Sequence, residues 1–251
     1  MSASDLLARV PSGSGRVPPR IAPPGETITV ENEQAVEAQG TDRLILFSDA
    51  VVAIAITLLA LELPVPVGPD AAALWDSARE HADHYLAFLI SFYAIAAAWG
   101  QHHRIFRSVV RNDSLLRKLN MLWLLMIILN PFATRLLVTE GGDTLTAHAL
   151  RWGFYAFLQV LAGLTLIGIT HHLNVRGLRA DGARSPLAAE PQRYAVLVGF
   201  ALSIPVFFAT TTAWLLWIAV PLLTSYVYLP LRDRRRGRIR GGGDHGSGRI
   251  G

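Results

Sequence analysis

The chain has 251 residues, of which 51% are hydrophobic and only 17% are charged. About a quarter of the residues in a soluble domain are usually charged, so this composition favours a membrane protein. The chain has no cysteine, which excludes disulfides, thiolate metal sites and cysteine nucleophiles. The net charge of +4 would suit a nucleic-acid-binding protein, but the basic residues are spread along the chain and predict no nucleic-acid partner.

Two tails are predicted to flank one transmembrane domain. Residues 1–40 are rich in Pro, Gly and Ser and hold no continuous apolar core of a signal peptide, so we predict a disordered cytoplasmic tail. Residues 232–251 are basic and rich in Gly, and they predict a second disordered cytoplasmic tail. Residues 41–231 are predicted to form the all-α membrane domain.

Six membrane-spanning helices are predicted in this domain, because a bilayer core about 30 Å thick requires about 20 mostly apolar residues per helix. The first four predicted spans are residues 44–63, 85–106, 119–138 and 150–170. The apolar stretch 194–230 would be about 55 Å long as a single helix. We therefore divide it near Thr210, Thr211 and Thr212 into a fifth and a sixth span.

The basic residues predict the orientation of the chain, because loops on the cytoplasmic side of a membrane are enriched in Lys and Arg. With six spans and the N-terminus inside, 20 of the 23 Lys and Arg residues lie in the two tails, the second loop and the fourth loop, or at the span ends next to them. Only Arg79, Arg135 and Arg151 fall outside these segments. The sequence thus predicts a multi-pass protein of the cell inner (plasma) membrane with both termini in the cytoplasm.

Polar side chains lie inside the first two predicted spans, where ionisable groups are costly and often mark function. Ser48 and Asp49 lie near the cytoplasmic end of the first span, and Trp99, His102 and His103 lie near the same end of the second. These groups are at similar depth and can satisfy one another as interhelical hydrogen-bond partners. Gating or proton sensing by the histidines, a metal site and a hydrolase centred on Ser48 are the other interpretations.

The first span has a second face, about 140° away from Asp49 on a helical wheel. On a helical wheel that advances about 100° per residue, the side chains of this face lie within about 60° of one direction. The residues of this face are Phe47, Ala50, Ile54, Thr57, Leu58 and Leu61. Periodicity alone allows this face to contact lipid, another helix or a pore.

Two sequence strings resemble the signatures of the transmembrane protein 175 family of cation channels. The string RLILFSDA begins at Arg43 and is followed by IAITL, which begins at Ile54. The string WGQHHRIF begins at Trp99, at the matching end of the second span. The two strings occur in the order and topology of the family, and the stretch from Arg43 to Phe106 that contains them spans about a quarter of the chain.

This resemblance implies a potassium-favouring cation channel whose pore is lined by the first span. Ile54 would form the principal hydrophobic constriction, Leu58 and Leu61 further apolar rings, and Thr57 a polar ring. The chain has a single copy of the first signature, which implies the single-repeat bacterial type and a homotetramer around one pore. The signatures also predict an interhelical polar network that comprises Arg43, Ser48, Asp49, Trp99, His102 and His103.

Potassium and other monovalent cations are the permeant species that this resemblance implies, and no cofactor, no metal site and no enzymatic activity are expected. The TVGYG filter of ordinary potassium channels is absent from the sequence. A secondary transporter is one alternative, although the first span has no glycine near its centre to interrupt it. A membrane enzyme or assembly factor that uses Ser48, Asp49 and His102 is another.

Overall fold

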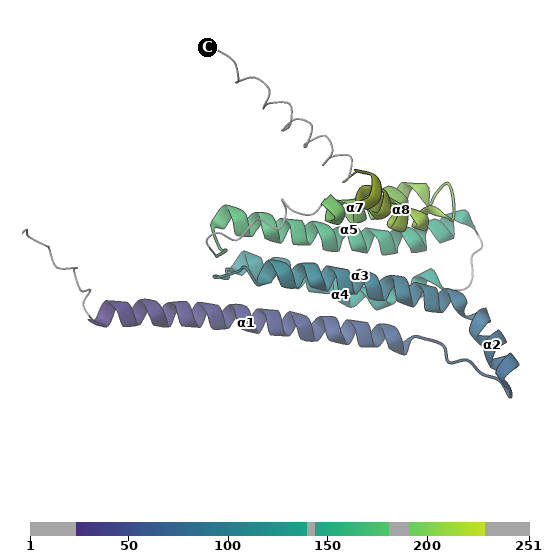
Figure 1. The fold of residues 1–251 in the computed structure, drawn as a ribbon, viewed down its shortest axis with the longest axis horizontal. Coiled ribbons are helices and arrows are strands. Elements are labelled where there is room, and N and C mark those ends of the chain that lie inside the picture. The colour runs from purple at the N-terminus through teal and green to yellow at the C-terminus, as the bar shows by residue number, and fades with distance from the viewer. Residues whose placement is uncertain (1–23, 140–143, 181–190, 229–251) are drawn as a thin grey trace, which may run out of the picture. The chain divides into compact units, whose positions relative to one another are not determined.

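The computed structural model describes residues 24–139, 144–180 and 191–228, and these ranges are predominantly helical (Figure 1). The elements are α1 (Pro24–Leu61), α2 (Ala71–Glu80), α3 (Ala82–Phe106), α4 (Ser114–Leu137), α5 (Leu145–Arg176), α7 (Pro191–Val206), the 3-10 helix η1 (Ala213–Leu215), α8 (Leu216–Leu223) and the π-helical segment η2 (Thr224–Tyr228). An isolated antiparallel bridge joins Val109 to Arg179. The all-α prediction is confirmed for the described residues.

Four helices are long and apolar enough to cross a membrane. They are Gln39–Leu61, Ala82–Phe106, Ser114–Leu137 and Leu145–Arg176, and they coincide with the first four predicted spans. Tyr194–Val206 and Ala213–Tyr226 are shorter apolar helical segments. The turn between these two segments contains Thr210–Thr212, where the sequence predicted a break. The chain is therefore a multi-pass membrane protein.

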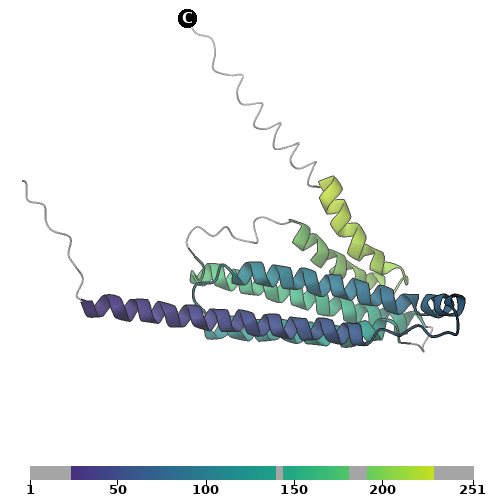
Figure 2. The ribbon, with the colours of Figure 1, turned by 60° about the horizontal axis from the view of Figure 1, so that its bottom comes forward.

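The chain divides into two compact units within α1, the first ending at Val36 and the second beginning at Glu37. In the second unit, α4 packs against α3 and α5, α7 packs against α5, and α8 packs against α7 (Figures 1 and 2). Large buried side chains fill the spaces between these helices. They include Phe106, Trp123, Tyr155 and Phe207, each 1% exposed or less.

Two helical segments differ from the sequence predictions. Helix α2 lies in the segment predicted to be a loop between the first two spans, and the Asp70 carboxylate caps it by accepting a hydrogen bond from the Ala73 N–H at 2.9 Å. Helix α1 begins at Pro24, so residues 24–40 are helical where a disordered tail was predicted. This segment is rich in Glu, Gln and Ala, which have high helix propensity. Residues 1–23 and 232–251 of the predicted tails lie outside the described residues.

Candidate functional site

Helix α1 presents one apolar face that the other described residues of the chain leave uncovered. Ile54 is 58% exposed, Leu58 46% and Leu61 81%. The opposite face is buried against the bundle through Val52 and Leu59, which are 3% and 2% exposed. One side of α1 is thus turned toward the bundle, and the face that the sequence predicted to line a pore points away from the described helices.

Thr57 is the polar member of this uncovered face. Its side chain is exposed, and its hydroxyl donates a hydrogen bond to the Ile54 carbonyl oxygen at 2.8 Å. This back-bond satisfies the hydroxyl proton within the helix and leaves the lone pairs of the hydroxyl oxygen directed outward. A threonine held in this way can offer an acceptor to water or to a cation.

A buried hydrogen-bonded chain joins α1, α3 and α4. Asn120 Nδ2 donates to Ser48 Oγ at 2.9 Å, and Asn120 Oδ1 lies 2.7 Å from His102 Nε2. In this amide orientation Oδ1 is an acceptor, so Nε2 of His102 carries the proton. The His102 ring is stacked against Trp123 and Phe106, with ring centroids 4.2 and 4.1 Å away. All three hydrogen-bonded side chains are fully buried, so the chain fixes how the three helices pack.

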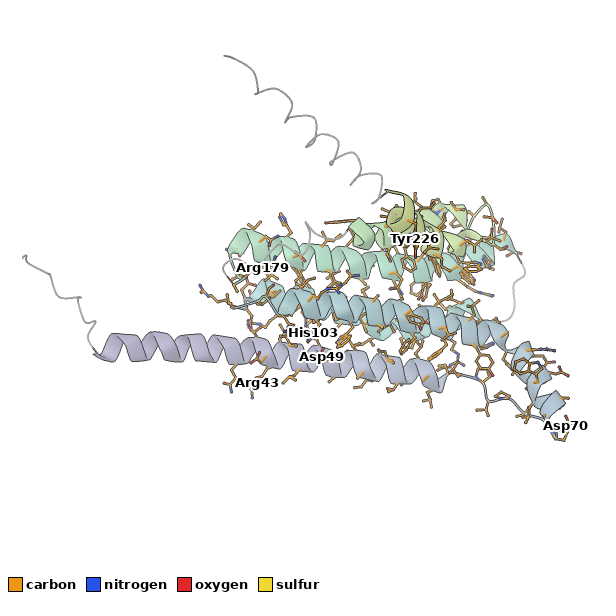
Figure 3. All side chains as sticks on the ribbon, viewed as in Figure 1. Arg43, Asp49, Asp70, His103, Arg179 and Tyr226 are labelled. Carbon is orange, nitrogen blue, oxygen red and sulfur yellow. The ribbon has the colours of Figure 1, made fainter. Side chains whose placement is uncertain are left out.

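A second, more exposed contact joins α1 to α3. The Trp99 indole N–H donates to Asp49 Oδ1 at 2.8 Å, and the Trp99 and His103 rings lie 5.6 Å apart between centroids. Figure 3 shows Asp49 and His103 on neighbouring helices, with Arg43 earlier on α1. Within the described residues, Arg43 is exposed and forms no hydrogen bond or ion pair with the other five residues of the predicted network. The predicted network is thus divided into two separate contacts, with Arg43 outside both.

The geometry of this region does not support hydrolytic chemistry at Ser48. The Ser48 hydroxyl is buried, donates to the Leu44 carbonyl at 2.8 Å and accepts from Asn120, whereas His102 bonds to Asn120 instead of to Ser48. Asp49 bonds to Trp99 and does not orient a histidine. Among the residues that the structure describes, no group of three or more His, Cys, Asp and Glu side chains is arranged to hold a metal ion.

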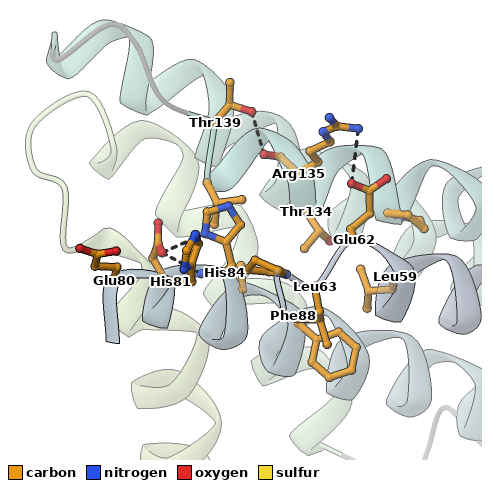
Figure 4. A pocket seen from close by; sticks show the side chains of 15 residues that line it. Leu59, Glu62, Leu63, Glu80, His81, His84, Phe88, Thr134, Arg135 and Thr139 are labelled. Carbon is orange, nitrogen blue, oxygen red and sulfur yellow. Dashed lines mark hydrogen bonds and ion pairs between the residues drawn. The ribbon is translucent and has the colours of Figure 1, made fainter. Parts of the chain in front are cut away.

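A polar cavity of about 710 Å³ lies where α1 ends, between that end, the start of α3 and the last turns of α4 (Figure 4). Arg135 from α4 forms an ion pair with Glu62, the residue after α1, with Nη1 and Oε2 3.3 Å apart. Glu80 and Asp83 also line the cavity. The ionisable groups of the cavity therefore include three carboxylates and one guanidinium, together with His81 and His84.

A polar clamp lies at the other end of the bundle, where α4 begins and α5 ends. Asp113 caps α4 by accepting from the Leu116 N–H at 2.8 Å, and its second oxygen lies 2.8 Å from His172 Nε2. Burial opposes ionisation, but these hydrogen bonds and the nearby His172 and Arg176 hold the pKa of Asp113 below its ordinary value. The clamp joins the connection between α3 and α4 to the end of α5.

Comparison with known proteins identifies the family of the chain. The family model described as the endosomal/lysosomal potassium channel TMEM175 matches residues 43–131, which include α1 from Arg43, all of α3 and most of α4. A potassium channel of Streptomyces collinus is 32% identical over 64% of this chain and 75% of its own length. The chain belongs to the TMEM175 family.

Other TMEM175 relatives include a potassium channel of Chamaesiphon minutus, 43% identical over 41% of this chain and 52% of its own length. The human endosomal/lysosomal proton channel TMEM175 is 29% identical over 48% of this chain and 24% of its own length. The crystal structure of a lysosomal potassium-selective channel TMEM175 homolog from C. minutus superimposes with a TM-score of 0.58 at 29% identity. This match covers 77% of the present chain and 98% of that structure. TMEM175 proteins are ion channels, and the described helices share their fold.

Two features of the site were not recognised in the sequence. Asn120 is the central member of the buried chain, and its signal was one of two amide side chains in an otherwise largely apolar helix. The pairing of Glu62 with Arg135 was also missed, although Arg135 was one of three basic residues outside the predicted cytoplasmic segments. Both features depend on which residues of different helices lie at the same depth.

Proposed function

We propose that four copies of this chain form a potassium-favouring cation channel of the plasma membrane, with the exposed face of α1 around a central pore. The observation that carries this proposal is the apolar face of Ile54, Leu58 and Leu61, which α1 turns away from its own bundle. Membership of an ion-channel family, with bacterial relatives named potassium channels, supports it. In this proposal each protomer contributes six spans with both termini in the cytoplasm: the four long apolar helices supply four of them, and the shorter segments Tyr194–Val206 and Ala213–Tyr226 would supply the other two.

In this proposal Ile54 forms the narrowest ring, and Leu58 and Leu61 form further apolar rings toward the mouth where α1 ends. A ring of branched apolar side chains blocks ions in the closed state because water leaves the constriction. Thr57 supplies four hydroxyl oxygens beside the narrowest ring, so a cation that loses part of its hydration shell finds polar acceptors there. Potassium is favoured over sodium because it is dehydrated more easily, and no bound cofactor is required.

Replacement of Ile54 by asparagine tests the proposal. Four amides at the constriction hydrogen-bond water, so Ile54→Asn is expected to raise cation flux into liposomes and to lower the preference for potassium over sodium. Ile56→Asn is the matched control, because Ile56 is partly buried against the core instead of lying on the exposed face. A buried amide without partners costs a few kcal/mol, so this variant is expected to lose stability without gaining flux.

Two outcomes would contradict the proposal. An increase in flux for Ile56→Asn together with unchanged flux and selectivity for Ile54→Asn would show that another face of α1 lines the pore. A detergent-corrected mass of one protomer for a preparation that still conducts ions would contradict the shared pore. The expected mass is that of four protomers.

A secondary transporter or an enzyme that uses Ser48, Asp49 and His102 is the competing function. The buried Ser48–Asn120–His102 chain favours a packing role for these residues. Replacing His102 would abolish catalysis in an enzyme, whereas in a channel it would alter assembly or gating.

A further inference from the structure

The ion pair between Glu62 and Arg135 lies directly beyond the exposed face of α1. Glu62 is the first residue after α1 and follows Leu61, whose side chain is 81% exposed. Its carboxylate is directed toward the last turn of α4, where Arg135 Nη1 lies 3.3 Å from Glu62 Oε2 (Figure 4). The two side chains are 49% and 69% exposed. The pair therefore lies at a water-accessible end of the helix.

The charges around this pair are mostly negative. Glu80 and Asp83 line the same cavity as Glu62, and Arg135 is the only guanidinium among the described residues that line it. A solvent-exposed ion pair contributes little to stability. Arg135 thus has a small structural effect, but it cancels one of the few charges next to the end of α1.

We propose that Arg135 is a determinant of channel conductance, because it neutralises Glu62 at the mouth of the pore and limits the local concentration of cations. This inference rests on the proposed function, in which four copies of α1 surround the pore. Each copy would then carry one Glu62–Arg135 pair around the outer mouth. Removing the guanidinium leaves four unpaired carboxylates there, and their field attracts cations to the entrance.

The size of the effect follows from Coulomb's law with ionic screening. If four unit charges lie one screening length from the pore axis, about 10 Å at 0.1 M ionic strength, they change the local cation concentration there about two- to three-fold. The screening length falls to about 3 Å at 1 M salt, so the same charges have almost no effect there. Salt dependence therefore separates an electrostatic action of Arg135 from a structural one.

The test measures the unitary potassium conductance of purified channels in planar bilayers at 0.1 M and 1 M KCl. Arg135→Gln is expected to raise the conductance for cations entering from the α1 end about two- to three-fold at 0.1 M and to leave it unchanged at 1 M. Glu62→Gln is expected to lower it at 0.1 M. The double variant restores the wild-type net charge, so its conductance should be close to that of the wild type.

Two control variants accompany these channels. Arg79→Gln removes the same charge from an exposed pair with Asp76 on α2, and it should leave the conductance unchanged. Arg135→Lys keeps the positive charge but loses the guanidinium shape. Its conductance should equal that of the wild type if charge alone is responsible.

Several results would overturn the inference. They are equal conductances for Arg135→Gln and Arg79→Gln, an increase that persists at 1 M KCl, or a double variant that behaves like Arg135→Gln alone. If Ile54→Asn alters selectivity while Arg135→Gln leaves conductance unchanged, only the role of Arg135 is refuted. If the wild type conducts no cation, the proposed function and this inference are both refuted.

Discussion

Asn120 provides the most direct test of how the helices are held together. Its side chain is fully buried, and it bonds to His102 at 2.7 Å and to Ser48 at 2.9 Å. Asn120→Ala leaves the His102 N–H without an acceptor, and an unsatisfied buried group costs about 1–3 kcal/mol. Ser48 keeps its hydrogen bond to the Leu44 carbonyl, so its lost bond to Asn120 adds less to the destabilisation. We expect a total loss of about 2–3 kcal/mol in the free energy of unfolding.

The assay is reversible unfolding of the purified protein in mixed micelles as the fraction of denaturing detergent is raised. Asn120→Leu keeps the branching and the number of side-chain heavy atoms but cannot hydrogen-bond, so it should be no more stable than the alanine variant. A double-mutant cycle of Asn120→Ala with Ser48→Ala should give a coupling energy of about 0.6 kcal/mol, the average for interhelical hydrogen bonds in membranes. Met121→Ala, on the exposed side of the same helix, should change stability by less than about 0.5 kcal/mol.

Two results would refute this reasoning. An Asn120→Leu protein as stable as the wild type would show that the hydrogen bonds contribute nothing beyond the volume of the side chain. A coupling energy of zero between Asn120 and Ser48 would show that the two side chains stabilise the protein independently, despite the 2.9 Å distance between them.

Two further predictions concern the ends of the bundle. Asp113→Ala removes an N-cap and the acceptor for His172, so it should destabilise the protein by about 1 kcal/mol at neutral pH in thermal unfolding. The pKa of Asp113 is lowered in the folded state, so its contribution is complete above its unfolded pKa of about 3.9. It begins to fall once the pH drops below about 4 and is lost as the pH falls through the lower folded pKa, so wild type and variant should converge in stability only in that acidic range. A reporter fused after Gly251 should be active only in the cytoplasm, and periplasmic activity would contradict the proposed orientation.

The long helices were predictable from the sequence because membrane insertion depends on local length and hydropathy. The side of α1 that faces the bundle was also predictable from the sequence, since Val52 and Leu59 lie on one side of the helical wheel and Ile54 and Leu61 on the other. Helix α2 was missed because its ten residues lie in a polar connection, where an N-cap such as Asp70 is a weak signal by itself.

The contacts between helices were only partly predictable. The sequence placed Ser48, Asp49 and His102 at one depth, which is correct, but depth does not specify which polar group meets which. That choice depends on the rotation of a third helix, α4, which places Asn120 between Ser48 and His102. Asp49 then accepts a hydrogen bond from Trp99 instead. A pairing of this kind needs the relative positions of three helices, and the sequence of each helix alone does not contain them.

The exposed face of α1 cannot be assigned to a pore from its hydrophobicity, because lipid and a closed apolar pore accept the same side chains. Other helices also expose large apolar residues, such as Tyr93 on α3 and Ile128 on α4. On α1, the exposed apolar side chains of Ile54 and Leu61 flank the exposed hydroxyl of Thr57, an aliphatic hydroxyl beside the residue proposed to form the narrowest ring. An amide introduced at Ile54 would be unfavourable against lipid and would leave ion flux unchanged, whereas in a pore it would admit water and raise flux. The two locations therefore predict different effects of one substitution on ion flux, and this difference decides between them.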